Sequence, residues 1–596
     1  MKTKIRFIKY CLILFLATSV FFAFKNPGNK ISVNSNKYFK LPDNLTENDY
    51  VPKTIIIKLK ERNRINSSIN SIDNISVNEV LNDLNTVSIN KIFTNAIKPV
   101  LRFSADGEKL ADLSLIYIFE YNSSKSIEEA VNEIYNTGEV EYAQPKYTQK
   151  LMFTPNDPFL GSQYFINKIQ APAGWDIQQG DTNVVIGIVD SGTDWDHPDL
   201  EGNIKYNYSD PINGTDDDND GYTDNYRGWD LGDRDNDPMV SPDDDHGSFV
   251  SGCADAVTNN GTGVSSPGFK CKFLPVKISN SAGLAAGYEG IVYAADHGCS
   301  IINCSWGGGY AGEFEQEIIN YVSINKNALV ICAAGNYNSS ETFYPADLKY
   351  VISVASTNSS DIRSSYSNYG NGIDVCSPGE GIRSTLYNNS YSIESGTSFS
   401  SPVCAGVCAI VKSQFPSYTG LQAGEKVRVT CDNIDLQNPS YIGKLGKGRI
   451  NMLRALTISS PSVRINSYTA IDGNNNVFQP NDTISITGIF KNYLDATSNA
   501  IVTISSTSTA VSILNGNSTL GVIPTLGTVT NNSSPFRVIV NNIAPVNSKV
   551  FFKVNYSDGS YTDFEYFSIT INPTYLSING NNITTTLNGK GNIGYN

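Results

Sequence analysis

The chain has 596 residues, a formal net charge of −14 at pH 7 and a sequence pI near 4.8. A chain of this length normally folds into several domains rather than around one core. The excess of acidic residues argues against nucleic acid as a partner, because phosphate binding needs clustered Lys and Arg, and is better suited to holding cations.

Residues 1–24 have the pattern of an export signal. Basic residues precede an apolar run, residues 11–24, that is too short to span a bilayer comfortably. We therefore predict a secreted, extracellular protein that is not inserted in a membrane after cleavage of the signal; an uncleaved anchor is the alternative. Residues 25–50 are polar and rich in Asn, which predicts a linker.

Residues 51–150 predict a small α+β module. We expect one strand over residues 52–60, a second over residues 113–121 and a third over residues 140–147. Ser126 and Glu129 have the spacing of a capping box, which predicts a helix from this point to about residue 135.

Residues 155–457 alternate short apolar strands with helices rich in small residues. This pattern predicts a doubly wound parallel sheet covered on both faces. Ligands of such sheets bind at the carboxyl ends of the strands, so we expect the chemistry there. The predicted strands are 184–189, 273–278, 301–304, 329–333 and 351–355.

Residues 460–575 change to alternating Val, Ile and Thr segments separated by Asn, Gly, Pro and Ser, which predicts a β-sandwich. Residues 576–596 have the composition of the start of another polar segment, and we expect the native chain to continue beyond this tail. The strands expected in the sandwich are 483–489, 500–505, 536–540, 549–554 and 564–571.

Nine of the ten cysteines fall between Cys253 and Cys431, and the tenth lies in the predicted signal. An odd number cannot pair completely, and several of the nine lie within apolar runs. Cysteine in such runs behaves as a small buried hydrophobic residue. We therefore predict buried free thiols rather than a disulfide framework or a zinc site.

The chain contains three histidines, so few side chains can act as a base near neutral pH. His297 ends a helical stretch and His197 lies in a turn before Pro198, positions that indicate structural roles. His246 lies at a predicted helix start, and the small residues after it allow tight packing. His246 is therefore the best candidate for a catalytic base.

A histidine base needs a carboxylate to hold its tautomer and a nucleophile to activate. Asp190 ends an apolar strand, Ser398 precedes a helix of small residues, and Asn336 follows another strand. Singly, each has a plainer interpretation as a turn residue or a helix cap. Their joint occurrence with His246 at strand ends and helix starts favours acyl transfer, with Asn336 as a donor to the oxyanion.

Four segments within residues 155–457 resemble the motifs of the subtilisin-like serine proteases, in the order that this family shows. Phe249 and Phe399 depart from the pattern, where the family usually has a second histidine and a methionine. The four segments are VIGIVDSGTDWDHPDL (185–200), DHGSFVSG (245–252), AAGN (333–336) and GTSFSSP (396–402).

The resemblance implies a serine endopeptidase that hydrolyses peptide bonds in proteins through an acyl-enzyme on Ser398. Asp190 and His246 would be its acid–base partners, and a monomer is expected. One alternative is a silent binding protein on a protease scaffold, which the complete set of four groups disfavours. The other is a lipase or esterase, which the chain order of Asp, His and Ser disfavours.

The resemblance also implies a substrate strand added along residues 305–307. Trp306 stands where the family commonly has leucine, and a preference for a large apolar residue at the cleaved position is one hypothesis. The module at 51–150 resembles the family's propeptide, an intramolecular chaperone and inhibitor that would be cut off near residues 148–154. The candidate substrate-binding residues are Ser305, Trp306, Gly307, Gly308, Ala334 and Gly335.

An insertion between Asp190 and His246 carries alternating aspartates of a kind that wraps around calcium. It is not an EF-hand, because position twelve is Arg227 rather than Glu. A solvated acidic loop is the alternative. The candidate calcium ligands here are Asp216, Asp218, Asp220 and Asp224.

The family resemblance implies a second calcium site, formed by Asp199 and a loop that follows the histidine motif. Asn260 would contribute its side chain there, and the threonines and valine of the loop their carbonyl oxygens. The candidate ligands of this second site are Asp199, Thr258, Asn260, Thr262 and Val264.

Overall fold

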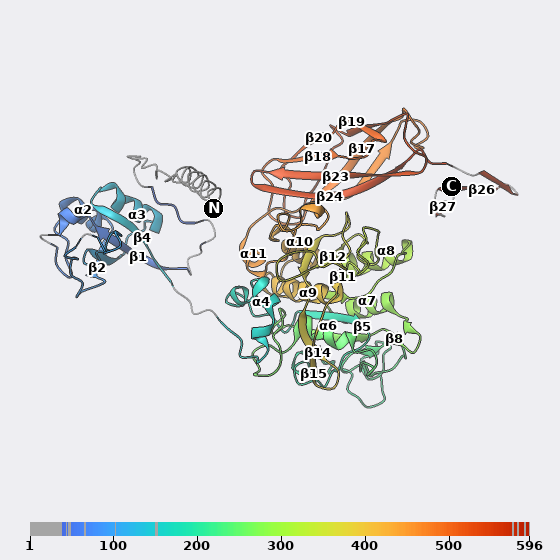
Figure 1. Cartoon of the computed structure of the whole chain (residues 1–596), viewed down its shortest axis with the longest axis horizontal. Helices are drawn as coiled ribbons and strands as arrows, with labels where there is room; N and C mark the ends of the chain where they lie inside the picture. Colours follow the sequence, from blue (N-terminus) through green and yellow to red (C-terminus); the bar gives the residue numbers. More distant parts are fainter. Residues whose placement is uncertain are drawn as a thin grey trace, which may run out of the picture. The chain divides into compact units, whose positions relative to one another are not determined.

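The computed structural model describes residues 38–42, 45, 49–64, 67–101, 103–148 and 153–574, and three short strands after them. The chain divides into two compact units, Met1–Lys150 and Leu151–Asn596 (Figure 1). The predicted signal, most of the predicted linker and most of the predicted cleavage region at 148–154 lie outside the described residues. Among the described residues, no helix is both long and apolar enough to cross a membrane.

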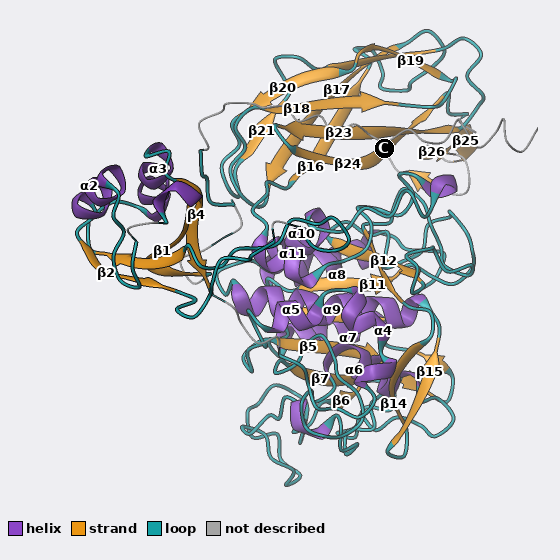
Figure 2. Cartoon of the chain, turned by 60° about the vertical axis from the view of Figure 1, so that its left-hand side comes forward, coloured by secondary structure: helices purple, strands orange, loops and turns teal. Residues whose placement is uncertain are grey.

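The first unit is an antiparallel sheet in the order β2-β3-β1-β4, with two helices on one face (Figure 2). Ile55 and Ile57 of the central strand pack with Val131 and Ile134 in one buried core. The predicted capping box closes the start of α3, where the Ser126 side chain accepts from the Glu129 N–H. Helix α2 and strand β2 were not predicted. The elements are β1 (Tyr50–Leu59), α2 (Ile75–Asp83), β2 (Thr86–Lys91), β3 (Ile116–Tyr121), α3 (Ile127–Asn136) and β4 (Val140–Tyr147).

The second unit is built on a sheet of seven parallel strands in the order β13-β12-β11-β10-β5-β7-β6. The predicted doubly wound parallel sheet is thus confirmed. The strands are β5 (Val185–Asp190), β6 (Trp229–Asp230), β7 (Lys272–Lys277), β10 (Ile301–Cys304), β11 (Leu329–Ala333), β12 (Val351–Thr357) and β13 (Val375–Pro378).

Helices cover both faces of this sheet, because alternate strand residues point to opposite sides. In β5, Ile186 and Ile188 belong to the core beneath α6 and α9, whereas Val185 and Val189 belong to the core beneath α7 and α8. The helices are α4 (Tyr164–Lys168), α5 (Ala171–Trp175), α6 (His246–Asp255), α7 (Gly287–Asp296), α8 (Glu313–Asn320), α9 (Thr397–Gln414), α10 (Gly420–Val429) and α11 (Met452–Thr457).

The strand order places a topological switch point beside β5. The chain leaves β5, passes through α6 and returns as β7 on one side of β5; it then passes through α7 and returns as β10 on the other side. Sheets of this kind bind ligands where the order reverses, outside the carboxyl ends of the strands. Two small hairpins flank this edge, β8 (Ser279–Asn280) with β9 (Gly283–Leu284), and β14 (Ile382–Leu386) with β15 (Ser390–Glu394).

Two antiparallel sheets follow the parallel sheet in sequence. One has the order β16-β17-β22-β19 with β21 paired to β17, the other the order β20-β18-β23-β24, and the two share one buried core. The strands are β16 (Val463–Ile471), β17 (Thr483–Asn492), β18 (Ala500–Ser505), β19 (Val511–Asn515), β20 (Asn517–Gly521), β21 (Thr528–Thr530), β22 (Phe536–Val540), β23 (Ser548–Asp558) and β24 (Tyr561–Ile571); β25 (Ser577–Gly580), β26 (Ile583–Asn588) and β27 (Asn592–Gly594) come last.

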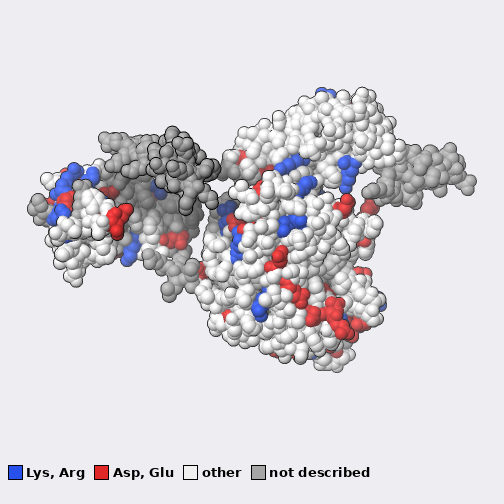
Figure 3. Space-filling view, viewed as in Figure 1, with Lys and Arg blue, Asp and Glu red and all other residues white. Residues whose placement is uncertain are grey.

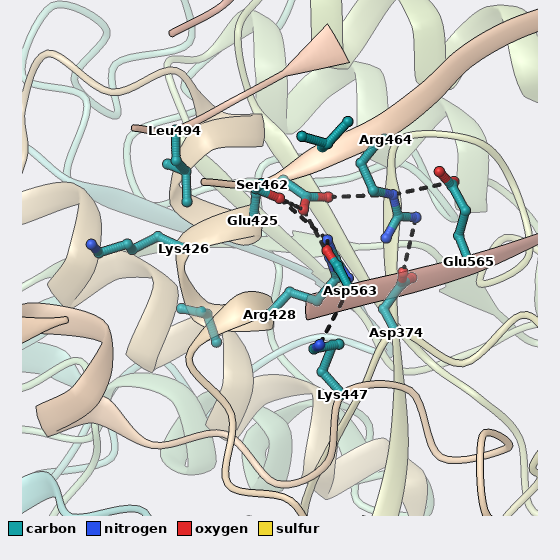
Figure 4. A network of polar contacts seen from close by, with 12 residues as sticks. Asp374, Glu425, Lys426, Arg428, Lys447, Ser462, Arg464, Leu494, Asp563 and Glu565 are labelled. Atoms are coloured by element: carbon teal, nitrogen blue, oxygen red, sulfur yellow. Dashed lines mark hydrogen bonds and ion pairs between the residues drawn. The ribbon is translucent and has the colours of Figure 1, made fainter. Parts of the chain in front are cut away.

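A buried charge network joins these antiparallel sheets to helix α10 (Figure 4). The Arg428 guanidinium donates to both carboxylate oxygens of Asp563 on β24, at 2.9 and 2.5 Å, and to Glu425 at 2.8 Å. Arg464 on β16 reaches Glu565 and Asp374, at 3.4 and 3.3 Å. Because these charges are buried and paired across the boundary, the sheets and the helix form one continuous body.

All nine cysteines from Cys253 to Cys431 are buried and free, as predicted. Cys11 lies outside the described residues.

Candidate active site

Asp190 and His246 meet at the carboxyl edge of the parallel sheet. Asp190 is the last residue of β5 and His246 the first of α6, and the His246 Nδ1 atom lies 2.7 Å from Asp190 Oδ1. The Ser191 N–H also donates to this Oδ1 at 2.8 Å. Asp190 is only 3% exposed, so its carboxylate is held rigidly and directs the far nitrogen of the imidazole, Nε2, away from the strand.

The environment of His246 favours the protonated imidazole. Burial acts to lower its pKa, but the Asp190 carboxylate outweighs burial, helped by the charges of Asp244 and Glu394, and raises the pKa of His246 to about 9. A neutral imidazole at this position can take up a proton and hold it in the presence of Asp190. The pair therefore has the property that a general base requires.

Ser398 is the second residue of α9, beside the end of β10. Its Oγ donates to the carbonyl oxygen of Ser305 at 3.2 Å, and the Ser305 hydroxyl donates to the Ser398 carbonyl at 2.7 Å. In a helix the first N–H groups have no partner within the helix. The N–H of Ser398 is one of these, so Ser398 provides both a hydroxyl group and a backbone N–H unpaired within the helix at the start of α9.

Asn336 follows β11 and is fixed by the residue that precedes Ser398. Its Oδ1 accepts from the Thr397 N–H at 2.9 Å and from the Thr397 hydroxyl at 2.8 Å. Because these bonds hold the oxygen end of the amide, the Nδ2 end is left to donate elsewhere. Thr397 therefore ties Asn336 to the start of the helix that carries Ser398.

These groups line one cavity of about 380 Å³. Of the predicted substrate-binding residues, Ser305, Trp306, Gly307 and Gly335 line it. Gly308 instead pairs with the Tyr344 backbone, and Ala334 is buried behind the cavity wall, where its N–H donates to Val354. The cavity also includes residues that were not expected from the sequence: Leu284, Tyr337 and Phe343.

The Trp306 side chain is held in place by its contacts with neighbouring residues. Its indole N–H donates to the Val189 carbonyl oxygen at 2.9 Å, and its ring packs edge-on against Tyr288 at 5.6 Å. A Cβ on Gly287 would lie 2.6 Å from the indole, so the ring is closely packed on that glycine. The large side chain is thus part of the wall.

His197 and His297 both occupy structural positions, as predicted. His197 is fully buried and its Nδ1 accepts from the Asp199 N–H at 3.0 Å. His297 caps α7 and stacks on Tyr293 with centroids 3.8 Å apart. Neither histidine lines the cavity that contains His246.

The acidic insertion brings some of its aspartates together and uses others elsewhere. Ligand atoms of Asp210, Asp216 and Asp218 lie within 4.8 Å of one another, the one cluster of this kind among the described residues. Asp220 instead accepts from His297 Nε2 at 2.8 Å, and Asp224 accepts from the backbone N–H groups of residues 213 and 214. The contribution of Asp210 was not foreseen, because it stands outside the alternating run.

Acidic side chains gather on the face seen in Figure 3 around the loops near β8. The charge repulsion that three converging carboxylates carry is reduced when a cation binds between them. The carboxylates of Asp210, Asp216 and Asp218 therefore offer the oxygen ligands that calcium prefers.

The loop after α6 lies against Asp199, as the second predicted site requires. However, Asp199 Oδ1 accepts from Asn260 Nδ2 and Oδ2 accepts from the Val264 N–H, each at 2.8 Å. Thr262 turns its N–H to the Asn260 oxygen, and the Thr258 hydroxyl donates to a backbone carbonyl. Burial raises the pKa of Asp199 to about 6.

A second carboxylate, which sequence reasoning missed, lies beside this loop. Asp157 accepts from the N–H groups of Asn259 and Asn260 at 2.9 and 3.0 Å. Asp157 and Asp199 therefore both lie against this loop and accept from its N–H groups.

The sequence of this chain is similar to the sequences of known proteins. The sequence model described as the subtilase family matches residues 181–447. Thermitase of Thermoactinomyces vulgaris is 36% identical over 308 residues, which cover 51% of this chain and 99% of the relative. A thermophilic serine proteinase of Bacillus sp. strain AK1 is 34% identical over 337 residues, or 56% of this chain and 76% of the relative.

Among solved structures, a protease from Pseudoalteromonas arctica is similar, with 28% identity and a TM-score of 0.43. The alignment covers 51% of this chain and 99% of that one.

Proposed function

This chain belongs to the subtilase family of serine endopeptidases, and from that premise we propose that Asp190, His246 and Ser398 are its catalytic triad and Asn336 its oxyanion donor. The observation that carries the proposal is the hydrogen bond between His246 and Asp190 in a cavity that also holds Ser398 and Asn336. Protein or peptide chains are the substrates.

In the acylation step, Ser398 Oγ attacks the scissile carbonyl carbon while its proton passes to His246 Nε2. This transfer requires the hydroxyl to rotate away from the Ser305 carbonyl, its partner in the free protein. Asp190 holds the imidazole by Nδ1 and stabilises the imidazolium that forms. His246 then protonates the leaving amine as the C–N bond breaks, which leaves an acyl-enzyme on Ser398.

In the deacylation step, a water molecule attacks the ester carbonyl and gives a proton to His246. The proton then returns to Ser398 Oγ as the carboxylic acid product leaves. In both steps the carbonyl oxygen carries negative charge, which Asn336 Nδ2 and the Ser398 N–H stabilise. Loss of one such donor typically costs about 3 to 4 kcal/mol of transition-state stabilisation.

A silent binding protein on the same scaffold is the rival function. A binding protein without catalytic activity would not need a buried carboxylate bonded to a histidine in a cavity that also holds a serine at a helix start. The free energy needed to bury Asp190 is offset only by the bonds it makes to His246 and to the backbone.

We further propose that the enzyme is made as a secreted precursor and works as a monomer. The α+β fold of the first unit supports the assignment of residues 51–150 as a propeptide. This propeptide would assist folding and inhibit the enzyme until it is cut off. For residues 460–575 we propose a β-sandwich domain. Expression without residues 25–150 tests the propeptide: we expect little active enzyme unless the missing segment is added in trans, and full activity without it would contradict the assignment.

Calcium is the cation that we propose for the acidic insertion. The carboxylates of Asp210, Asp216 and Asp218 converge there and fit a hard cation that takes oxygen ligands, and bound calcium would stabilise the long loop. We propose calcium for the region around Asp199 as well, because the Asp157 and Asp199 carboxylates both lie against the loop after α6.

Casein hydrolysis tests the catalytic assignment. We expect Ser398→Ala and His246→Ala each to lower kcat by several orders of magnitude while the variants stay folded. Ser395→Ala is the matched control, an exposed serine three residues earlier in the same segment. Equal activity of Ser398→Ala and Ser395→Ala would contradict the proposal.

A further inference from the structure

The ring of Phe343 lies between two glycines of the active-site cavity. A Cβ on Gly307 would be 2.6 Å from Phe343 Cε1, and a Cβ on Gly335 would be 3.2 Å from its Cδ1. The ring edge that carries Cδ1 and Cε1 therefore lies close to both the segment after β10 and the segment after β11. A Cβ on Gly307 would therefore force atoms to move, and a Cβ on Gly335 would be in tight contact with the ring.

The backbone holds Phe343 in this position. The Gly308 N–H donates to the Tyr344 carbonyl at 2.8 Å, the Tyr344 N–H donates back to Gly308 at 2.7 Å, and the Phe343 N–H donates to Asp347 at 2.6 Å. Residues on both sides of the ring are thus tied to the cavity wall. These bonds fix the backbone from which the ring extends into the cavity.

This space adjoins the reacting groups. Gly307 lies two residues after Ser305, whose carbonyl accepts from Ser398 Oγ, and Gly335 directly precedes Asn336. A substrate whose carbonyl carbon meets Ser398 and whose oxygen meets Asn336 must direct the side chain of the same residue between these two segments. Phe343 lines the cavity beside these two glycines, so its ring limits the space into which that side chain would extend.

We propose that Phe343 is a specificity-determining residue that makes the primary pocket shallow, so that the enzyme cleaves after small residues such as Gly, Ala and Ser. This inference rests on the proposed function. A large apolar residue at the cleaved position would have to displace a ring held between backbone segments, and overpacking of this kind is costly. Trp306, which suggested a preference for a large residue, lies in the cavity wall with its indole bonded to the Val189 carbonyl oxygen.

The test uses two tetrapeptide p-nitroanilides that differ only in the residue before the cleaved bond, Ala or Phe. We expect the native enzyme to show a kcat/KM for the Ala substrate at least about tenfold higher than for the Phe substrate, since small changes of fit in a pocket have effects of this size. Phe343→Gly should open the pocket and shift the ratio towards Phe by about tenfold or more. Phe551→Ala, a change on the partly exposed strand β23, should leave the ratio unchanged.

A native enzyme that prefers Phe, or a Phe343→Gly ratio equal to that of the native enzyme, would overturn the inference. Counting active sites with a fluorophosphonate separates this outcome from failure of the proposed function: an enzyme that labels stoichiometrically but keeps its ratio contradicts only the role of Phe343. If Phe343→Gly does not label, Phe343→Leu takes its place with a smaller expected shift. Cleavage sites mapped in unfolded casein by the native enzyme give a further test, and sites that follow mainly large residues would count against Phe343.

Discussion

The ring centroids of Phe249 and Phe399 lie 4.4 Å apart, with their planes tilted by 49°. Phe249 shares helix α6 with His246, and Phe399 directly follows Ser398 in α9. The Phe399 ring also lies 5.7 Å from the His246 ring. The two departures from the family motifs are therefore in contact with each other, and together they join the helices that carry the base and the nucleophile.

We predict that substitutions at Phe249 and Phe399 are energetically coupled. Phe249→His would place a polar ring in a site that is 1% exposed, and Phe399→Met would remove the aromatic contact. The double variant should cost less than the sum of the two, by about 0.5 to 1.5 kcal/mol, the usual worth of an aromatic pair. Urea unfolding gives the unfolding free energy of the parent, the two single variants and the double variant. The measurements are made in a Ser398→Ala background, which prevents autolysis.

The matched control combines Phe249→His with Phe552→Met in the antiparallel sheets, a pair of sites that share no core. Their effects should add. If the effects of substitutions at Phe249 and Phe399 also add, the two residues are not energetically coupled and the prediction is contradicted.

The pKa of His246 predicts an alkaline enzyme. The imidazole can take the Ser398 proton only when it is neutral, and its pKa is raised to about 9. Consequently kcat/KM should rise as the pH increases through about 9. Asp190→Asn removes the main charge that raises this pKa, so the rising limb should move to lower pH while the maximum falls by about 10⁴-fold.

Glu394→Gln is the comparison variant, because Glu394 raises the same pKa without a hydrogen bond to the ring. It should move the limb by less and keep most of the activity. A rising limb at the same pH in the native enzyme and Asp190→Asn would contradict the electrostatic link between Asp190 and His246.

The charge network around Arg428 predicts strong dependence of stability on single substitutions. Arg428→Met leaves the Asp563 carboxylate, 0% exposed in its side chain, with Lys447 at 3.4 Å as its remaining ion-pair partner, and should cost about 3 to 5 kcal/mol of unfolding free energy. Arg428→Met with Asp563→Leu should recover part of this loss, because the buried Asp563 charge is then absent and Glu425 keeps Arg464 at 3.8 Å. Thermal unfolding in the Ser398→Ala background compares the two variants.

The same network predicts a pH dependence. Burial acts to raise the pKa of Asp563, but Arg428 and Lys447 hold it well below the usual value. The unfolded chain therefore binds a proton that the folded chain does not, so the stabilisation is present above about pH 4 and is lost as the pH falls further. Stability of Arg428→Met equal to that of the parent across this range would contradict a role for the network.

Calcium binding in the acidic insertion predicts a melting temperature that falls when the cation is removed. In the Ser398→Ala background, a chelator should lower the melting temperature of the parent, whereas Asp216→Asn and Asp218→Asn should lose most of this response. Glu289→Gln removes an exposed charge outside the insertion and should respond like the parent. A parent that melts at the same temperature with and without the chelator would contradict the site.

Much of the catalytic domain could be predicted from the sequence, because its motifs and its buried strands are local signals. Strands 301–304 and 329–333 have the same bounds in the structure, and the other predicted strands of the parallel sheet differ by one or two residues. The residues of the four motifs come together because each ends a strand or starts a helix at the same edge. Periodicity and strand ends are enough to find such positions.

Other features depend on contacts between distant segments and have no local signal. Phe343 lies in a loop without a motif and matters only because Gly307 and Gly335 pack against it. Arg428 and Asp563 are 135 residues apart. In the insertion, the alternation indicated Asp220 as a ligand, but the same carboxylate is bonded to His297, whose approach the sequence does not reveal.

Identification of the residue modified by a fluorophosphonate tests the assignment of the nucleophile most directly. The reagent reacts with a serine only where a base and an oxyanion site activate it, so mass spectrometry of the digested adduct reports the assembled site rather than the fold alone. We predict one adduct, on Ser398, in the native enzyme and in Ser395→Ala, and none in Ser398→Ala. An adduct on the Ser398→Ala chain, or a native enzyme that hydrolyses casein without modification at Ser398, would contradict the account.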